Sequence, residues 1–123
     1  MPFLELERTG GLIGWNERLR VASDGGWVVT SRGDGREMAR GIFDSATMDA
    51  LRHALEQVPR GANGRYDARG ADFINLKLSR SVGDASILLV EGPWLAGQGG
   101  IPGDWKPVFD LLSPTLDAAR LGR

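Results

Sequence analysis

The sequence predicts an α+β fold in which two helices cover an antiparallel β-sheet, in the order ββββ-α-ββ-α. Three observations support this prediction. Segments of alternating apolar and polar residues fill the first third of the chain, separated by the turn signals Ser23-Asp24-Gly25-Gly26 and Gly33-Asp34-Gly35. Two later segments, 45–58 and 104–120, repeat apolar residues at helical spacing. Two more alternating segments lie between those helices.

Four strands are expected in the first third of the chain, over Phe3–Arg8, Trp15–Ala22, Trp27–Arg32 and Arg36–Phe43. Short Asp-Gly turn signals between the later strands indicate an antiparallel meander. In the second strand one face carries Trp15, Glu17, Leu19 and Val21, and the other carries Asn16, Arg18 and Arg20. Glu5, Glu7 and Glu17 can lie near one another on adjacent strands, although nothing in the sequence indicates an acid–base pair.

The first helix is expected to begin at an N-cap formed by Asp44 or Ser45 and to end at Pro59 and Gly61. Its apolar stripe leaves the only histidine, His53, on the solvent side. That stripe consists of Met48, Leu51, Leu55 and Val58, with Ala54 between them. The arginine- and glycine-containing residues 60–71 are expected to form a surface loop.

Two further strands are expected over Phe73–Arg80 and Ala85–Val90. The second is more fully apolar, which favours a central place in the sheet. After a loop from Gly92 to Gly103, Asp104 is the expected N-cap of the last helix, where Pro114 should bend the chain or begin a second short helix. The apolar stripe of this helix is Trp105, Val108, Phe109, Leu112, Leu116 and Ala119.

Length and composition limit the possible classes of protein. A chain of 123 residues suits a single domain, 1–123, with a core that needs no covalent staples. The absence of cysteine excludes disulfides and thiolate metal sites, and the net charge of −1 provides no general attraction to nucleic acid or to an anionic membrane. Without a signal sequence or a membrane-spanning apolar run, the chain is expected to be cytoplasmic.

The sequence contains no recognisable catalytic or cofactor-binding motif. One histidine and no cysteine leave only carboxylates as metal ligands, and neither a calcium loop nor a zinc-protease motif is present. In the glycine-containing tract after Gly92, Gln98 stands where a phosphate-binding loop needs lysine. Arg60, Arg65 and Arg69 lie near Tyr66, but no stacking platform for nucleic-acid bases accompanies them. We therefore expect no metal, no cofactor, no nucleic-acid or membrane partner, and no enzymatic activity.

The stretch Leu6-Glu7-Arg8-Thr9-Gly10-Gly11, followed by apolar residues and a charged strand, resembles the opening of the emfourin family. These are small bacterial proteins named for an inhibitor of protealysin, a thermolysin-like metalloprotease. The similar pattern continues through the helix around Leu51, the strands around Phe73 and Ile87, and the helix around Phe109. The chain departs from it in the long tract Pro93–Gly103. The resemblance implies an α+β protein that blocks a metalloprotease through the segment after the glycine pair.

The candidate partner-binding residues are Arg8, Thr9, Gly10, Gly11, Leu12, Ile13 and Trp15. In one interpretation the glycines form a bulge or wide turn, and Leu12, Ile13 and Trp15 fold inward over the sheet edge. In the other, part of the loop stays exposed and Leu12 or Ile13 fills an apolar pocket of the protease. The glycines then allow the backbone to approach a cleft closely.

Two alternatives to the inhibitor hypothesis remain open. The first is a small-ligand-binding or enzymatic domain that uses the Gly92–Gly103 loop, with Trp94 and Trp105 lining a pocket. The second is an interaction domain of an unrelated complex. A protein-binding role is favoured over the first alternative because the sequence offers no general base, metal-ligand set or phosphate-binding lysine.

Overall fold

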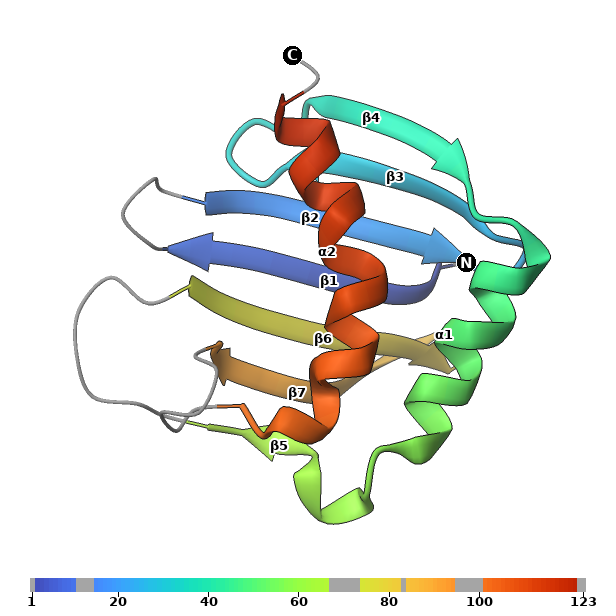
Figure 1. Ribbon diagram of the computed structural model, residues 1–123. Coiled ribbons are helices and arrows are strands. Elements are labelled where there is room, and N and C mark those ends of the chain that lie inside the picture. The colour runs from blue at the N-terminus through green and yellow to red at the C-terminus, as the bar shows by residue number, and fades with distance from the viewer. Residues whose placement is uncertain (1, 11–14, 67–73, 83, 95–100, 122–123) are drawn as a thin grey trace.

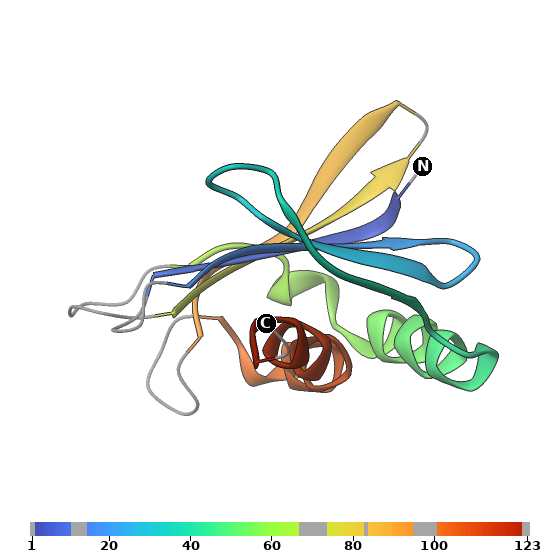
Figure 2. The ribbon, with the colours of Figure 1, turned by 90° about the horizontal axis from the view of Figure 1, so that it is seen from above.

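The computed structural model describes residues 2–10, 15–66, 74–82, 84–94 and 101–121. Within these ranges, seven strands form one sheet, and both helices lie on the same face of it (Figures 1 and 2). The predicted α+β class is confirmed. The strands are β1 (Pro2–Gly10), β2 (Trp15–Ala22), β3 (Gly26–Ser31), β4 (Glu37–Ile42), β5 (Gly64–Arg65), β6 (Ile74–Val82) and β7 (Ala85–Pro93). The helices are α1 (Ser45–Gln57) and α2 (Lys106–Leu121).

Strand β1 occupies the middle of the sheet, whose order is β4-β3-β2-β1-β6-β7-β5. The first four strands form the expected antiparallel meander. Strand β6 then pairs antiparallel with the free edge of β1, so that Leu6 lies opposite Leu19 on one side and opposite Leu78 on the other. This register joins the meander and the later strands into a single sheet with one continuous apolar face.

The expected order ββββ-α-ββ-α omits one short strand, and the order within the described residues is ββββ-α-βββ-α. Strand β5 lies in the segment that was expected to be a loop, and it pairs parallel with β7 at Val90 and Glu91. The N–H of Tyr66 donates to the Glu91 carbonyl at 2.8 Å. Gly92 permits this approach, because a Cβ there would lie 2.6 Å from the Tyr66 carbonyl oxygen. A strand of two residues is too short to show the alternation of apolar and polar residues by which strands are predicted from sequence.

The prediction that the strand over Ala85–Val90, now β7, occupies a central place in the sheet was wrong. Strand β7 lies next to the last position, between β6 and the short β5. Its first residues, Ala85 to Ile87, are exposed, and the β6–β7 hairpin projects away from the helices (Figure 2). The apolar composition of β7 therefore reflects burial of only its second half.

The core lies between the sheet and the helices. The predicted stripe of α2 and the preceding turn is buried throughout, from Trp105 to Ala119. It packs with inward leucines of the three central strands, including Leu6, Leu19 and Leu78. In α1, Met48, Leu51 and Ala54 are buried, whereas His53 is exposed, as predicted. Neither α1 nor α2 has the length and apolar character that crossing a bilayer requires, within the part of the chain described.

Of the two predicted helix N-caps, the one for α1 is confirmed and the one for α2 is wrong. Asp44 is the N-cap of α1 and accepts a hydrogen bond from the Thr47 N–H at 2.7 Å, which lowers the pKa of the Asp44 carboxyl. Asp104 is not an N-cap, because it lies inside a 3₁₀ turn, Gly103–Trp105, that precedes α2. Pro114 is exposed and starts no second helix, since α2 continues through it.

Replacing Phe109 by alanine should lower the free energy of unfolding by about 3–5 kcal/mol, because it removes a large side chain from the helix–sheet interface. Phe109 is 1 % exposed and packs against the rings of Trp94 and Trp105. The matched substitution His53→Ala, on the solvent side of α1, should leave stability nearly unchanged. Denaturant unfolding monitored by circular dichroism measures both variants. Equal losses would contradict the assignment of the helix faces.

Candidate protein-binding site

The candidate segment joins the ends of two central strands. Thr9 pairs with Asn16 and Gly10 with Trp15, while Gly10 also lies opposite Ile74 of β6. Gly10 is exposed and has a φ of 81°, in the left-handed region that favours glycine. Gly11, Leu12 and Ile13 lie outside the described residues, as does the side chain of Trp15.

Other strand ends meet at the same end of the sheet. The N–H of Trp94 donates to the Ile74 carbonyl, and the N–H of Ile101 donates to the Pro93 carbonyl, both at 2.9 Å. The described residues that flank segments 11–14, 67–73 and 95–100 therefore lie along one end of the sheet. This places the ends of three chain connections beside one another, as is common where loops on a rigid scaffold form a binding surface.

A chain of four alternating charges lies on the inner face of the sheet just before this end. Arg8 of β1 donates to Asp117 of α2 at 2.6 Å, and its Nε lies 3.9 Å from a carboxylate oxygen of Glu17 on β2. Arg120 of α2 donates to the other oxygen of Glu17 at 3.1 Å. Arg8 is 5 % exposed and Glu17 is 2 % exposed. The four groups are compensated within the cluster and link β1, β2 and the second half of α2.

The burial of Arg8 differs from the contact role expected for it as a candidate partner-binding residue. Its side chain lies in phase with Leu4 and Leu6 and is directed beneath α2, because alternate residues of a strand share one face. Arg8 is therefore a residue that positions the strand end, and its guanidinium group is not presented on the molecular surface.

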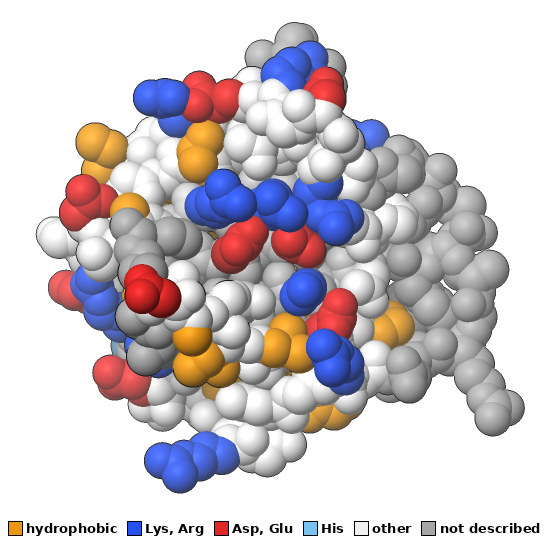
Figure 3. Space-filling view, turned by 180° about the vertical axis from the view of Figure 1, so that it is seen from behind, with side chains coloured by type: hydrophobic (Ala, Val, Ile, Leu, Met, Phe, Trp, Pro, Cys, Tyr) orange, Lys and Arg blue, Asp and Glu red, His pale blue; other side chains and the backbone are white. Residues whose placement is uncertain are grey.

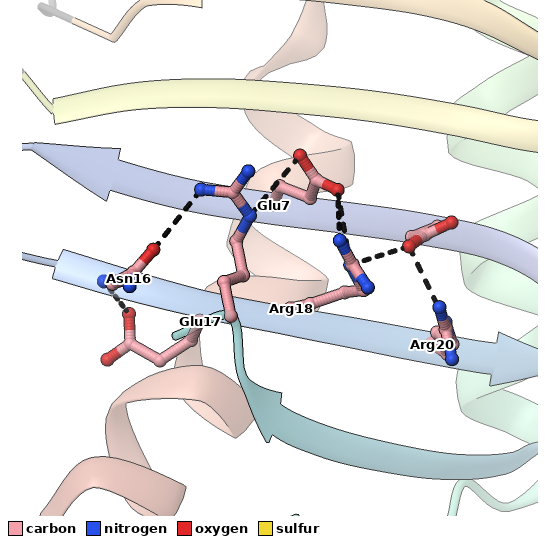
Figure 4. A network of polar contacts seen from close by, with 7 residues as sticks. Glu7, Asn16, Glu17, Arg18 and Arg20 are labelled. Carbon is pink, nitrogen blue, oxygen red and sulfur yellow. Dashed lines mark hydrogen bonds and ion pairs between the residues drawn. The ribbon is translucent and has the colours of Figure 1, made fainter. Parts of the chain in front are cut away.

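A second polar network covers the same strands on the face that the helices leave open (Figure 4). Arg32, the residue after β3, donates to the Asn16 side chain at 3.1 Å, and its backbone N–H donates to the Asn16 carbonyl at 3.0 Å. Arg32 also lies 3.6 Å from Glu7. The network continues along the strands, where Arg18 pairs with both Glu7 and Glu5 at 3.0 and 2.8 Å. Seen from behind, basic and acidic side chains gather at the centre of this face (Figure 3).

Glu5, Glu7 and Glu17, which the sequence allows to lie near one another, do not share one face of the sheet. Glu5 and Glu7 belong to the outer network, whereas the Glu17 carboxylate is buried under α2. Arg8 shares a strand face with the buried residues Leu4 and Leu6, and Glu17 shares one with Leu19 and Val21. This placement of opposite charges on inward faces is the sequence signal that could have revealed an internal ion pair. No local signal indicated Asp117 or Arg120 as their partners.

The two networks together hold the base of the β1–β2 connection from both faces of the sheet. On β2 the neighbouring residues Asn16 and Glu17 are bound to opposite faces, Asn16 by Arg32 and Glu17 by Arg120. The backbone N–H of Asn16 also donates to the Glu17 carboxylate at 3.0 Å. The strand ends on either side of this connection are therefore held by side-chain contacts on both faces of the sheet.

The alternative pocket between Trp94 and Trp105 is not favoured by the geometry. Trp105 is 2 % exposed, its Nε1–H donates to the Ala62 carbonyl at 2.8 Å, and its ring stacks on Phe109. Trp94 meets the same Phe109 ring edge to face, with centroids 4.9 Å apart. Trp105 is therefore a core residue, and its indole does not offer a free polar group to a ligand.

Within the described residues, no group of three or more histidine and acidic side chains is arranged to hold a metal ion. Comparisons of the chain with protein-family models, curated proteins and solved structures found no match.

Replacing Glu17 by glutamine should lower the free energy of unfolding by about 3 kcal/mol, because it leaves the charge of buried Arg8 with weaker compensation. The matched control is Glu91→Gln, which breaks the ion pair with Arg65, whose side chain is 76 % exposed. This control should cost less than about 1 kcal/mol, as surface pairs usually do. Urea unfolding of both variants measures the difference. An equal effect would contradict a structural role for the buried cluster.

Proposed function

We propose that this chain is a non-catalytic protein-binding domain that inhibits a thermolysin-like metalloprotease through the β1–β2 connection, residues 9–15. The observation that supports this proposal most directly is the attachment of Asn16 and Glu17 to opposite faces of the sheet. Strand ends that are already fixed need no further ordering when a partner binds, which lowers the entropic cost of association. The resemblance of Arg8-Thr9-Gly10-Gly11 to the emfourin opening supplies the class of partner.

The proposed roles of the candidate residues differ along the segment. Arg8 positions β1 from beneath α2, and Gly10 supplies a backbone conformation that other residues rarely adopt. Leu12 and Ile13 supply aliphatic side chains of the kind that fill an apolar pocket, as dominant interface residues commonly do. In this proposal the inhibitor contributes shape and apolar contacts, and the protease supplies all of the catalytic groups.

Leu12→Ala and Ile13→Ala, made separately, should identify the residue that fills the pocket. Loss of such a side chain is expected to weaken inhibition by about thirtyfold, equivalent to about 2 kcal/mol of binding free energy. The inhibition constant against a thermolysin-like protease of the same host measures this effect, with thermal unfolding recorded beside it. Ile87→Ala is the matched control, because Ile87 is a 45 % exposed aliphatic on β7 outside the proposed segment.

The possible results separate the competing interpretations. Weaker inhibition with unchanged stability supports the proposed contact. Lower stability in both variants without a change in inhibition shows instead that Leu12 and Ile13 belong to the core. If the wild-type protein leaves every thermolysin-like protease of its host fully active, the inhibitor proposal is wrong. Copurification of other proteins from the host would then identify an unrelated complex, and an adjacent protease gene would count in favour of inhibition.

A further inference from the structure

A hollow in the molecular surface lies at the opposite end of β1 from Gly10. It has a volume of about 330 Å³ and is lined by Phe3 of β1, by Arg52, Leu55 and Glu56 of α1, and by Arg80 of β6. This volume is at the lower end of the range found for ligand pockets, about 300–1,000 Å³. The proposed protease-binding segment contributes nothing to it.

Phe3 lies at an irregularity in the strand pairing at the start of β1. The pairing register with β2 shifts between Pro2 and Leu4, as in a β-bulge. Phe3 is half-buried, and two guanidinium groups approach its ring. The Cζ of Arg52 lies 5.6 Å from the ring centroid and the Cζ of Arg80 lies 6.0 Å from it. Both distances fall in the range of cation–π contacts, so two positively charged guanidinium groups lie against the same aromatic ring.

The carboxylates of the chain compensate these two charges only in part. Arg52 donates to the Ser23 carbonyl at 2.9 Å, and its one ion pair among the described residues is with Asp49 at 3.8 Å, whose side chain is 80 % exposed. Arg80 has no carboxylate within 4.0 Å in the same part of the chain. Glu56 lines the hollow without forming an ion pair there. Two arginines beside an apolar surface are a chemical match for an anion that carries an apolar group.

We propose that this hollow binds a small organic anion, with its phosphate or carboxylate group held by Arg52 and Arg80 and its apolar portion placed on Phe3 and Leu55. The guanidinium fork suits both oxyanions. The bond from Arg52 to Ser23 fixes one of the two forks before the ligand arrives. Glu56 opposes the anion from the rim, which limits affinity and gives the site a residue whose removal should strengthen binding.

Isothermal titration calorimetry with phenyl phosphate and benzoate tests this proposal on the full chain, with inorganic phosphate and benzyl alcohol as partial ligands. We expect saturable binding of at least one of the two organic anions. Arg80→Gln should weaken that binding by about tenfold, as expected for loss of a charge-assisted contact. Glu56→Gln should strengthen it. Arg60→Gln is the matched control, because Arg60 is exposed and lies outside the hollow.

Arg80→Gln is preferred to Arg52→Gln because Arg52 also bonds to the Ser23 carbonyl. Thermal unfolding of each variant verifies that it folds. Opposite effects of Arg80→Gln and Glu56→Gln, with Arg60→Gln unchanged, would support the site. Absence of saturable binding by both organic anions would overturn the proposal. Equal binding of inorganic phosphate and phenyl phosphate would also overturn it, because the surface of Phe3 and Leu55 would then contribute nothing.

Discussion

The pairing of β1 on both of its edges is the constraint on which the rest of the structure depends. Its ladders to β2 and β6 connect the N-terminal meander with strands that follow α1 in the chain. Because residues in register share a face, Leu6 is aligned with Leu19 and Leu78 beneath α2, and Glu7 is aligned with Arg18 on the opposite face. The apolar surface on which α2 packs and the charged network on the outer face therefore both follow from the register of β1 with its two neighbours.

The charged groups on the two faces of this sheet have different physical effects. On the outer face, exposed pairs such as Arg20 with Glu5 are screened by solvent, and they orient side chains more than they stabilise the fold. On the inner face, Arg8 and Glu17 cannot be solvated, so both require partners. Asp117 and Arg120 supply those partners and thereby match the second half of α2 to one position over β1 and β2. This specificity also fixes the strand ends that flank the proposed binding segment.

The sequence allowed prediction of features whose causes lie within a few residues. The stripe of α2 followed from apolar spacing, and the cap of α1 followed from Asp44. Predictions that depended on distant neighbours were less successful. The second half of β7 is largely buried while its first residues are exposed, and Gly92 leaves room for the backbone of Tyr66 beside the short strand β5. The cap expected at Asp104 gave way to a 3₁₀ turn in which Trp105 is anchored on Ala62. At the candidate site, the sequence pointed to the glycine pair but gave no sign of the residues that pair with Arg8.

By itself, the sequence determined the α+β class, the meander, the two helices and the buried stripe of α2, because hydrophobic period and turn chemistry are local properties. Only the tertiary structure decided that β1 is central, that Arg8 is internal, and that Phe3 meets two arginines. These outcomes depend on contacts between residues far apart in the chain, such as Arg8 and Asp117, which are separated by 109 positions. A local sequence pattern can indicate that a side chain points inward. The side chains that it contacts are determined only when strands and helices pack together.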